Sequence, residues 1–334
     1  MLKEVAFNLE RIKYYRLPVF AWYAVSTLLI VICSCGKSKT EFVFSELASG
    51  VTNNLNDIHF TDDTTGYVCG GERYEEGNIR KTTDGGETWL PQGEDLSKAL
   101  NSIIFFGDDT GFSVGIDGKI FNTLNGGLNW NLHQLPRYQP MHDIFMVNEK
   151  RGFCCGGDGY KSGYIYNTTD GGENWQIDTF QHELMSLCFT SETIGYAAGY
   201  GAVFKTVNDG LSWELTGAAG DFFKSVFFTD EQTGFAVGYE GSIIKTSNAG
   251  ETWENIRNGN NLLQETWHLE QIVFRNSAIG YIVGEKGCFL KTTDSGETWE
   301  AVKNAPAVNL YGICLAADGG FLCGEDGKIF RFLE

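Results

Sequence analysis

Two acidic residues could supply hydrolytic chemistry in this sequence. Asp57 and Asp143 each stand just before a short apolar run, 58–60 and 144–146. Most glycoside hydrolases catalyse the reaction with two carboxyl groups that face one cleft. The same residues can equally cap the turns in which they occur, and a chain rich in acidic residues always offers such candidates. Turn capping and solvation is therefore the favoured interpretation, and hydrolysis is the alternative.

A motif of eight residues, here called the box, occurs six times and reads Thr-x-(Asp/Asn)-x-Gly-x-x-Trp. The Asp or Asn can accept N–H groups of its own turn, the glycine permits a tight backbone, and the Trp can pack between neighbouring units. Asn can replace Asp as an acceptor but not as a general acid, so we predict a structural box in which each indole N–H finds an acceptor. The residues are Asp84 and Trp89, Asn125 and Trp130, Asp170 and Trp175, Asn208 and Trp213, Asn248 and Trp253, and Asp294 and Trp299.

Each repeat reads as four short strands. An apolar run, which suits a strand buried on both faces, is followed by a polar turn ending in Gly and a second strand such as 234–238. A Gly-rich loop and a third strand such as 243–246 lead into the box, whose Trp would start a fourth strand. Seven such openings, with Trp-to-Trp spacings of 41, 45, 38, 40 and 46 residues, predict an all-β fold. We expect a seven-bladed β-propeller of four-stranded antiparallel blades over residues 41–334. A parallel solenoid would have shorter repeats and fewer turns.

The last unit, residues 310–334, has no box and no fourth strand. The alternating segment from Phe42 to Leu47 has no repeat of its own. A propeller must close its ring to protect the sheet edges. We therefore predict that residues 41–48 pair with the third strand of the last blade.

The first 40 residues predict export. The segment from Leu17 to Cys33 is uncharged, and Ile32-Cys33-Ser34-Cys35 resembles a bacterial lipobox. That pattern implies a signal peptide over 1–34, a diacylglyceryl thioether on Cys35 and a polar tether over 35–40. An uncleaved N-terminal membrane anchor is the alternative, and both place the body outside the cytoplasm, on the periplasmic side or at the cell surface.

Charge and cysteine content exclude several functions. After residue 34 the chain has 21 basic and 41 acidic side chains, a net charge of -20, which argues against nucleic-acid binding. Seven cysteines follow Cys35, without a CxxC spacing, and the five histidines show no ligand spacing, so we expect neither a disulfide framework nor a metal or cofactor. Cys69, Cys155 and Cys323 share a repeat position with Val and Ala, where we expect a small buried side chain.

The box resembles the Asp-box, or BNR, repeats of sialidases, sortilin-type receptors and xyloglucan-active glucanases. The whole unit resembles more closely the photosystem II stability/assembly factor family, with the full pattern in Ile58…Trp89 and Val226…Trp253. The resemblance covers about residues 41–334 and implies a seven-bladed assembly-factor propeller. In the sialidases the boxes lie at the end opposite to the active site.

The sialidase alternative requires an arginine cluster, because the guanidinium group binds a carboxylate in a bidentate manner. Only seven arginines follow residue 35. Arg73, Arg137 and Arg257 fall in loops of one predicted face, so their convergence stays open. Sialidase-like or xyloglucanase-like hydrolysis remains the alternative function.

Binding is expected on the face opposite to the boxes, where the loops differ most between units. Enlarged loops over 71–78, 157–164 and 255–270 supply most of the candidates, although Trp267 could simply cover a blade edge. The binding candidates are Arg73, Tyr74, His142, Tyr160, Lys161, Trp267 and His268. The channel mouth should be lined by Asn56, Asn101, His142, Met185, Lys224, Glu270 and Tyr311.

The sequence thus predicts a non-catalytic lipoprotein of the cell envelope. Its propeller would bind a protein partner, or a glycan, and could serve as an assembly factor for an envelope complex. A membrane contact is expected only through the lipid on Cys35.

Overall fold

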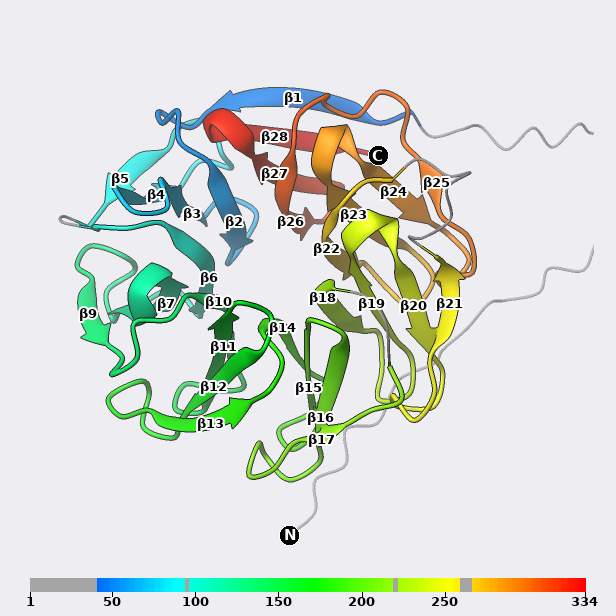
Figure 1. The fold of residues 1–334 in the computed structure, drawn as a ribbon. Coiled ribbons are helices and arrows are strands. Elements are labelled where there is room, and N and C mark those ends of the chain that lie inside the picture. Colours follow the sequence, from blue (N-terminus) through cyan, green and yellow to red (C-terminus); the bar gives the residue numbers. More distant parts are fainter. Residues whose placement is uncertain (1–40, 94–95, 219–221, 259–265) are drawn as a thin grey trace, which may run out of the picture. The chain divides into compact units, whose positions relative to one another are not determined.

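The structure is a computed structural model that describes residues 41–93, 96–218, 222–258 and 266–334. Within these residues, seven four-stranded antiparallel sheets succeed one another around a common axis (Figure 1). This confirms the predicted seven-bladed propeller. The predicted signal peptide, the lipid-bearing Cys35 and the tether lie outside the described residues.

Each blade begins beside the axis and runs outward. The inner strands are β2 (Leu55–Phe60), β6 (Leu100–Phe106), β10 (Met141–Met146), β14 (Leu184–Phe189), β18 (Phe223–Phe228), β22 (Leu269–Phe274) and β26 (Leu310–Ala316). The second strands are β3 (Gly66–Gly71), β7 (Thr110–Gly115), β11 (Gly152–Asp158), β15 (Gly195–Gly199), β19 (Gly234–Gly238), β23 (Gly280–Gly284) and β27 (Gly319–Gly324).

The outer half of each blade carries the box. The third strands are β4 (Gly77–Thr82), β8 (Lys119–Thr123), β12 (Ser162–Thr168), β16 (Ala202–Thr206), β20 (Ile243–Thr246), β24 (Phe289–Thr292) and β28 (Lys328–Leu333). The outermost strands are β5 (Leu90–Gln92), β9 (Asn131–Gln134), β13 (Gln176–Phe180), β17 (Glu214–Leu215), β21 (Glu254–Arg257), β25 (Glu300–Ala301) and β1 (Val43–Ala48). Four single turns of 3-10 helix join second to third strands: η1 (Ile116–Gly118), η2 (Tyr239–Gly241), η3 (Glu285–Gly287) and η4 (Glu325–Gly327).

The ring closes as predicted. Strand β1 pairs antiparallel with β28, from Val43 opposite Leu333 to Ala48 opposite Lys328. The ring of Phe42, just before β1, lies 5.4 Å from that of Phe289 in blade 6 and 6.0 Å from that of Phe332 in blade 7. The first strand of the described chain therefore completes the last blade and covers the edge of β28.

Two expectations about strands are wrong in detail. The strands buried along nearly their whole length are the second strands, as in β3 and β19, whereas the inner strands alternate buried and half-buried residues. The physical reason is that inner strands turn one face to the axis, while second strands lie between two neighbouring blades. The outermost strands begin one residue after the box Trp, so the Trp belongs to the turn.

Aromatic stacking joins neighbouring blades. Tyr67 of blade 1 stacks on Phe105 of blade 2 with ring centroids 3.6 Å apart, and Trp130 meets Phe105 edge-on at 5.8 Å. The pair Tyr196 and Phe228 repeats the stack between blades 4 and 5 at 3.7 Å. This confirms that the box Trp packs between blades. The indole N–H groups of Trp175 and Trp253 have hydrogen-bond acceptors. The indole N–H groups of the other four box Trp residues have no partner among the described residues, so the expected acceptor is absent for Trp89, Trp130, Trp213 and Trp299.

The box explains why Asp and Asn interchange. In the first box Asp84 accepts the hydroxyl of Thr82 (2.8 Å) and the N–H of Thr88 (2.9 Å) on one oxygen, and the hydroxyl of Thr88 (2.6 Å) on the other. In the fourth box Asn208 accepts the same kinds of bond, and its amide donates to the hydroxyl of Ser212 (2.9 Å). A hydroxyl can donate to a carboxylate or accept from an amide, so either residue closes the turn.

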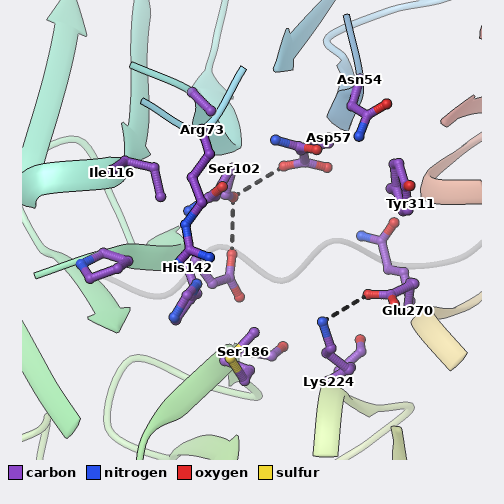
Figure 2. A pocket seen from close by; sticks show the side chains of 18 of the residues that line it. Asn54, Asp57, Arg73, Ser102, Ile116, His142, Ser186, Lys224, Glu270 and Tyr311 are labelled. Carbon is purple, nitrogen blue, oxygen red and sulfur yellow. Dashed lines mark hydrogen bonds and ion pairs between the residues drawn. The ribbon is translucent and has the colours of Figure 1, made fainter. Parts of the chain in front are cut away.

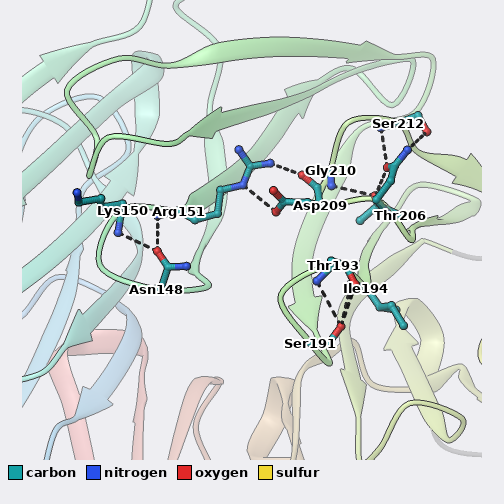
Figure 3. A network of polar contacts seen from close by, with 11 residues as sticks. Asn148, Lys150, Arg151, Ser191, Thr193, Ile194, Thr206, Asp209, Gly210 and Ser212 are labelled. Carbon is teal, nitrogen blue, oxygen red and sulfur yellow. Dashed lines mark hydrogen bonds and ion pairs between the residues drawn. The ribbon is translucent and has the colours of Figure 1, made fainter. Parts of the chain in front are cut away.

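A cation from one blade reaches the box of the next. In three blades this cation is a lysine directly before the box Thr: Lys81, Lys205 or Lys245. Its ammonium group donates to a carbonyl in the box of the next blade at 2.8 Å. Blade 3 has no lysine at that position, and Arg151 donates instead to the carboxylate (3.0 Å) and carbonyl of Asp209 in blade 4 (Figure 3). These bonds run between blades and so fix neighbouring sheets to each other.

The cysteines fulfil the packing expectation. Those at the shared repeat position, Cys69, Cys155 and Cys323, are fully buried, as are the Val and Ala residues that replace them in other blades. All seven cysteines of the described residues are free thiols. Burial raises the pKa of the thiol in Cys69, Cys155 and Cys323, which keeps them protonated and unreactive.

Candidate functional site

A cavity of about 620 Å³ opens at one end of the ring, at the face opposite to the boxes. Its lining comes from the inner strands and from loops that lead into them or connect second to third strands (Figure 2). Seven residues at one equivalent position of the inner strands line it together. They are Asn56, Asn101, His142, Met185, Lys224, Glu270 and Tyr311, the residues expected at the channel mouth.

A β-bulge produces this ring of side chains. In every inner strand the pairing with the second strand shifts between the first and third residues, so the second residue is the extra one; Asn56 and Lys224 are examples. The residue before it, such as Leu55 or Phe223, is fully buried in the blade. A bulge directs its extra residue away from the regular pleat. Seven blades thus present seven side chains of six residue types in one ring, here called the bulge ring.

Polar contacts hold three members of the bulge ring. The imidazole of His142 lies 3.2 Å from the Glu183 carboxylate, and the ammonium of Lys224 lies 3.2 Å from that of Glu270. Glu183 also accepts the N–H of Tyr160 (2.9 Å). These bonds lower the pKa of the Glu183 carboxyl against the opposing effect of burial. The walls are therefore preorganised and charged.

Below the bulge ring, a belt of side chains joins the blades in succession from blade 1 to blade 7, where Gly312 occupies the equivalent position and provides no side chain. Asp57 accepts the N–H groups of Ile58 (2.8 Å) and Ile103 (2.9 Å), and Asp143 accepts those of Ile144 and Leu187, each at 2.8 Å. Further round, Gln271 accepts the N–H of Ile313 at 2.7 Å, and Ser186 and Ser225 accept from the next blade in the same way. The belt is thus a series of interblade hydrogen bonds that spans all seven blades and, within the described residues, does not close between blades 7 and 1.

The hydroxyl of Ser102 bridges the two acidic members of the belt, at 3.1 Å from Asp57 and 3.0 Å from Asp143 (Figure 2). Burial raises the pKa of Asp57 to about 7, with the Asp143 charge adding to the effect. Burial also raises the pKa of the Asp143 carboxyl. A hydroxyl donates only one proton, so a protonated carboxyl on one side allows both contacts to be hydrogen bonds.

This arrangement bears on the hydrolase alternative. Both oxygens of Asp57 and of Asp143 are engaged by backbone N–H groups or by Ser102. A general acid must instead present its proton to a substrate oxygen. The geometry therefore favours a structural role for both carboxyls, but not the expected one of turn capping and solvation, because both residues lie in inner strands and bind the next blade.

The structure brings only some of the predicted binding residues together. Arg73, His142 and Tyr160 line the cavity. Tyr74 instead packs beneath Arg73 and Lys98, and Trp267 lies half-buried under the guanidinium of Arg257 at 5.0 Å, where it packs against the core shared by blades 5 and 6. Lys161 is exposed beside the cavity, and His268 stacks on Tyr239 at 4.0 Å. A binding role for any of them stays a prediction.

Sequence reasoning missed an arc of aromatic rings at the rim. Successive ring centroids lie 4.8 Å apart from Tyr160 to Tyr200, 5.6 Å from Tyr200 to Phe222, and 4.9 Å from Phe222 to Tyr239. His268 extends the arc. The available signal was a Tyr directly after the last Gly of a second strand, at Gly199-Tyr200 and Gly238-Tyr239. We call these five residues the aromatic arc.

The part of the chain that the structure describes contains no helix long and apolar enough to cross a membrane. In the same residues, no group of three or more His, Cys, Asp and Glu side chains is placed to hold a metal ion.

Comparisons with known proteins agree with the geometry. A family model described as "Photosynthesis system II assembly factor YCF48" matches residues 36–179 and 212–308. The photosystem II assembly lipoprotein Ycf48 of Synechococcus sp. (strain CC9902) is 36% identical over 81 residues, which are 23% of this chain and 23% of that protein. The match thus spans about a quarter of that curated relative.

Solved structures share the fold at low identity. The structure titled "YCF48 bound to D1 peptide" has a TM-score of 0.70 and 22% identity, covering 89% of this chain and 96% of that one. YCF48 from Cyanidioschyzon merolae has a TM-score of 0.68 and 19% identity, covering 87% and 98%. An ancestral GH74 enzyme has a TM-score of 0.68 and 14% identity, covering 86% of this chain but 46% of the enzyme. At these identities the likeness is one of fold.

Proposed function

Because the chain belongs to the family of photosynthesis system II assembly factor YCF48, we propose that it is a non-catalytic propeller that binds a segment of a protein partner and assists the assembly of a complex in the cell envelope. The observation that carries the proposal is the bulge ring. Seven rigid blades place seven side chains of six residue types around one cavity of about 620 Å³. Variable side chains on a rigid scaffold suit recognition.

The relatives support a protein partner. One solved relative is titled as bound to a D1 peptide, and the curated relative is named an assembly lipoprotein. We carry over the class of partner, an extended protein segment, and leave its identity to experiment. The lipobox-like Ile32-Cys33-Ser34-Cys35 supports an exported protein anchored to a bacterial membrane through the lipid on Cys35.

The geometry gives no comparable support to hydrolysis. The carboxyls that could act, Asp57 and Asp143, are engaged in the interblade belt. The shared fold with a GH74 enzyme places no catalytic residue in this chain, because fold alone does not carry an activity.

Site-specific photo-crosslinking tests the proposal. A photoreactive residue replaces Met185 of the bulge ring in the full-length lipidated protein, in membranes of its own host. The matched control replaces Leu211, which is 80% exposed in a box turn at the other end of the ring. We expect one defined envelope protein to be cross-linked from position 185 and not from position 211. Equal cross-linking from both positions, none from 185, or glycan turnover that Asp143→Asn abolishes, would overturn the proposal.

A further inference from the structure

The aromatic arc and the bulge ring form one continuous surface. Tyr160, Phe222 and Tyr239 belong to the arc and also line the cavity. Tyr160, Tyr200 and Tyr239 are 55%, 43% and 37% exposed, although aromatic side chains usually bury most of their surface. Exposed rings held against one another beside a cavity are suited to contact a ligand.

Tyr160 is held in place by the cavity wall. Its φ is +69°, a left-handed conformation that is a genuine outlier for a bulky residue. The Glu183 carboxylate accepts the backbone N–H of Tyr160 at 2.9 Å, and the backbone N–H of Glu183 donates to the Tyr160 carbonyl at 3.2 Å. The same carboxylate pairs with His142 of the bulge ring. The most exposed ring of the arc is thus tied to the ionic lining of the cavity.

The charge on this face is negative. The cavity lining itself is close to balanced: Glu72, Glu183 and Glu270 stand beside Arg73, His142 and Lys224, while the carboxyls of Asp57 and Asp143 are engaged in the belt. The imbalance comes from the segments that connect second to third strands, which carry eight acidic residues against three basic ones. The acidic residues are Glu72, Glu75, Glu76, Asp117, Glu240, Glu285, Glu325 and Asp326, and the basic ones are Arg73, Lys161 and Lys286.

The shape of the arc favours a cation over a sugar chain. Interplanar angles between successive rings are 35°, 56°, 56° and 40°, so the arc curves and does not form one flat platform. Rings set at angles around an acidic site surround a cation, whose charge is attracted to the ring faces. The protein already places one of its own cations there, since the ammonium of Lys224 lies 5.8 Å from the ring of Phe222.

We propose that the bound protein segment is basic, with lysine or arginine side chains lying against the aromatic arc and facing the carboxylates of the cavity. This inference rests on the proposed function and names the chemistry of the partner. A protein segment is favoured over a small cation because the arc and the bulge ring together offer an extended surface. The partner should therefore carry more than one positive charge in that segment.

Peptide binding tests the inference. The probes are a fluorescein-labelled Gly-Lys-Ala-Arg-Gly-Lys-Ala-Gly and its counterpart with Glu at the three charged positions, measured by anisotropy with the full-length protein in detergent. We expect the basic peptide to bind and to weaken as salt is raised from about 50 to 300 mM, and the acidic peptide not to bind. Tyr160→Ala with Tyr239→Ala should weaken binding about tenfold. Tyr138→Ala, an exposed tyrosine in the loop before β10, should leave it unchanged.

A charge reversal gives a second test that does not depend on the rings. Glu72→Lys changes the cavity lining, whereas Glu87→Lys makes the same change in net charge on an exposed box residue at the other end. We expect only Glu72→Lys to weaken the basic peptide. Tighter binding of the acidic peptide, equal binding of both, or equal effects of the two reversals would overturn the inference.

The two proposals can fail separately. A partner cross-linked from position 185 through a neutral or acidic segment would overturn the basic-segment inference and leave the assembly function standing. Absence of any cross-linked partner, with selective binding of the basic peptide, would overturn the assembly function and support the charge preference.

Discussion

The carboxylate of Asp57 in blade 1 accepts the backbone N–H of Ile103 in blade 2 at 2.9 Å. This bond belongs to the belt that runs from blade 1 to blade 7, and Ser102 links it to Asp143. A half-buried carboxyl that joins two blades connects the stability of the propeller to pH.

We expect Asp57→Asn to alter the pH dependence of stability. Burial raises the pKa of Asp57 from 3.8 to about 7, so the folded state holds a proton that the unfolded state releases between these values. The resulting stabilisation is complete below about pH 4 and is lost as the pH rises through 7. Between pH 5 and 8, the wild type should lose on the order of a few kcal/mol of unfolding free energy relative to Asp57→Asn. Urea unfolding at both pH values measures it.

His59 gives the unfolding free energy a pH dependence of the opposite sign, so the comparison must cancel it. Burial lowers the pKa of His59 from 6.5 to about 4, so its contribution is lost as the pH falls through that range. Both proteins contain His59, and only their difference reports on Asp57. Asp63→Asn, an exposed aspartate of the turn after β2, should follow the wild type. A constant difference between wild type and Asp57→Asn at all pH values would contradict the prediction.

The closing strand should make a large contribution to stability. Phe42 is only 6% exposed, so Phe42→Ala should lower the unfolding free energy by about 3–5 kcal/mol. Val43, the next residue, is 56% exposed, and Val43→Ala should change it by less than about 0.5 kcal/mol. Removing residues 36–48 should destabilise more than Phe42→Ala, because it also exposes the edge of β28. Thermal unfolding unaffected by that deletion would show that β1 does not close the ring.

The box should require an acceptor and not a charge. Asn208→Asp should be nearly neutral, since the carboxylate keeps the bonds to Thr206 and Ser212 and the Ser212 hydroxyl can turn round to donate. Asn208→Ala removes the acceptor and should cost about 1–2 kcal/mol. Urea unfolding of the two variants compares them directly. Equal losses in both would mean that the amide donor, and not the acceptor, holds the turn.

Alanine substitutions at two glycines distinguish the cost of a steric clash from the cost of backbone strain. Gly296 and Gly201 have similar φ values of +76° and +66°. A methyl group on Gly296 would lie 2.3 Å from the Phe235 ring of the preceding blade, whereas one on Gly201 would meet nothing within 4 Å. Gly201→Ala should cost about 1 kcal/mol, and Gly296→Ala about 1–3 kcal/mol more. Similar unfolding free energies for the two variants would show that the box turn yields without disturbing the blade interface.

The sequence by itself determined the number of blades, the box turns and the closing strand, because strand periodicity and turn chemistry act over a few residues and repeat. It also located the bulge ring, since Asn56, Lys224 and their equivalents occupy one repeat position. The tertiary structure alone decided which side chains meet across blades. Tyr160 and Tyr239 are 79 residues apart, and whether they join one arc depends on the curvature of the ring and on loop conformations that no local pattern specifies. The same holds for Asp57 and Asp143, whose pairing through Ser102 exists only once three blades are in place.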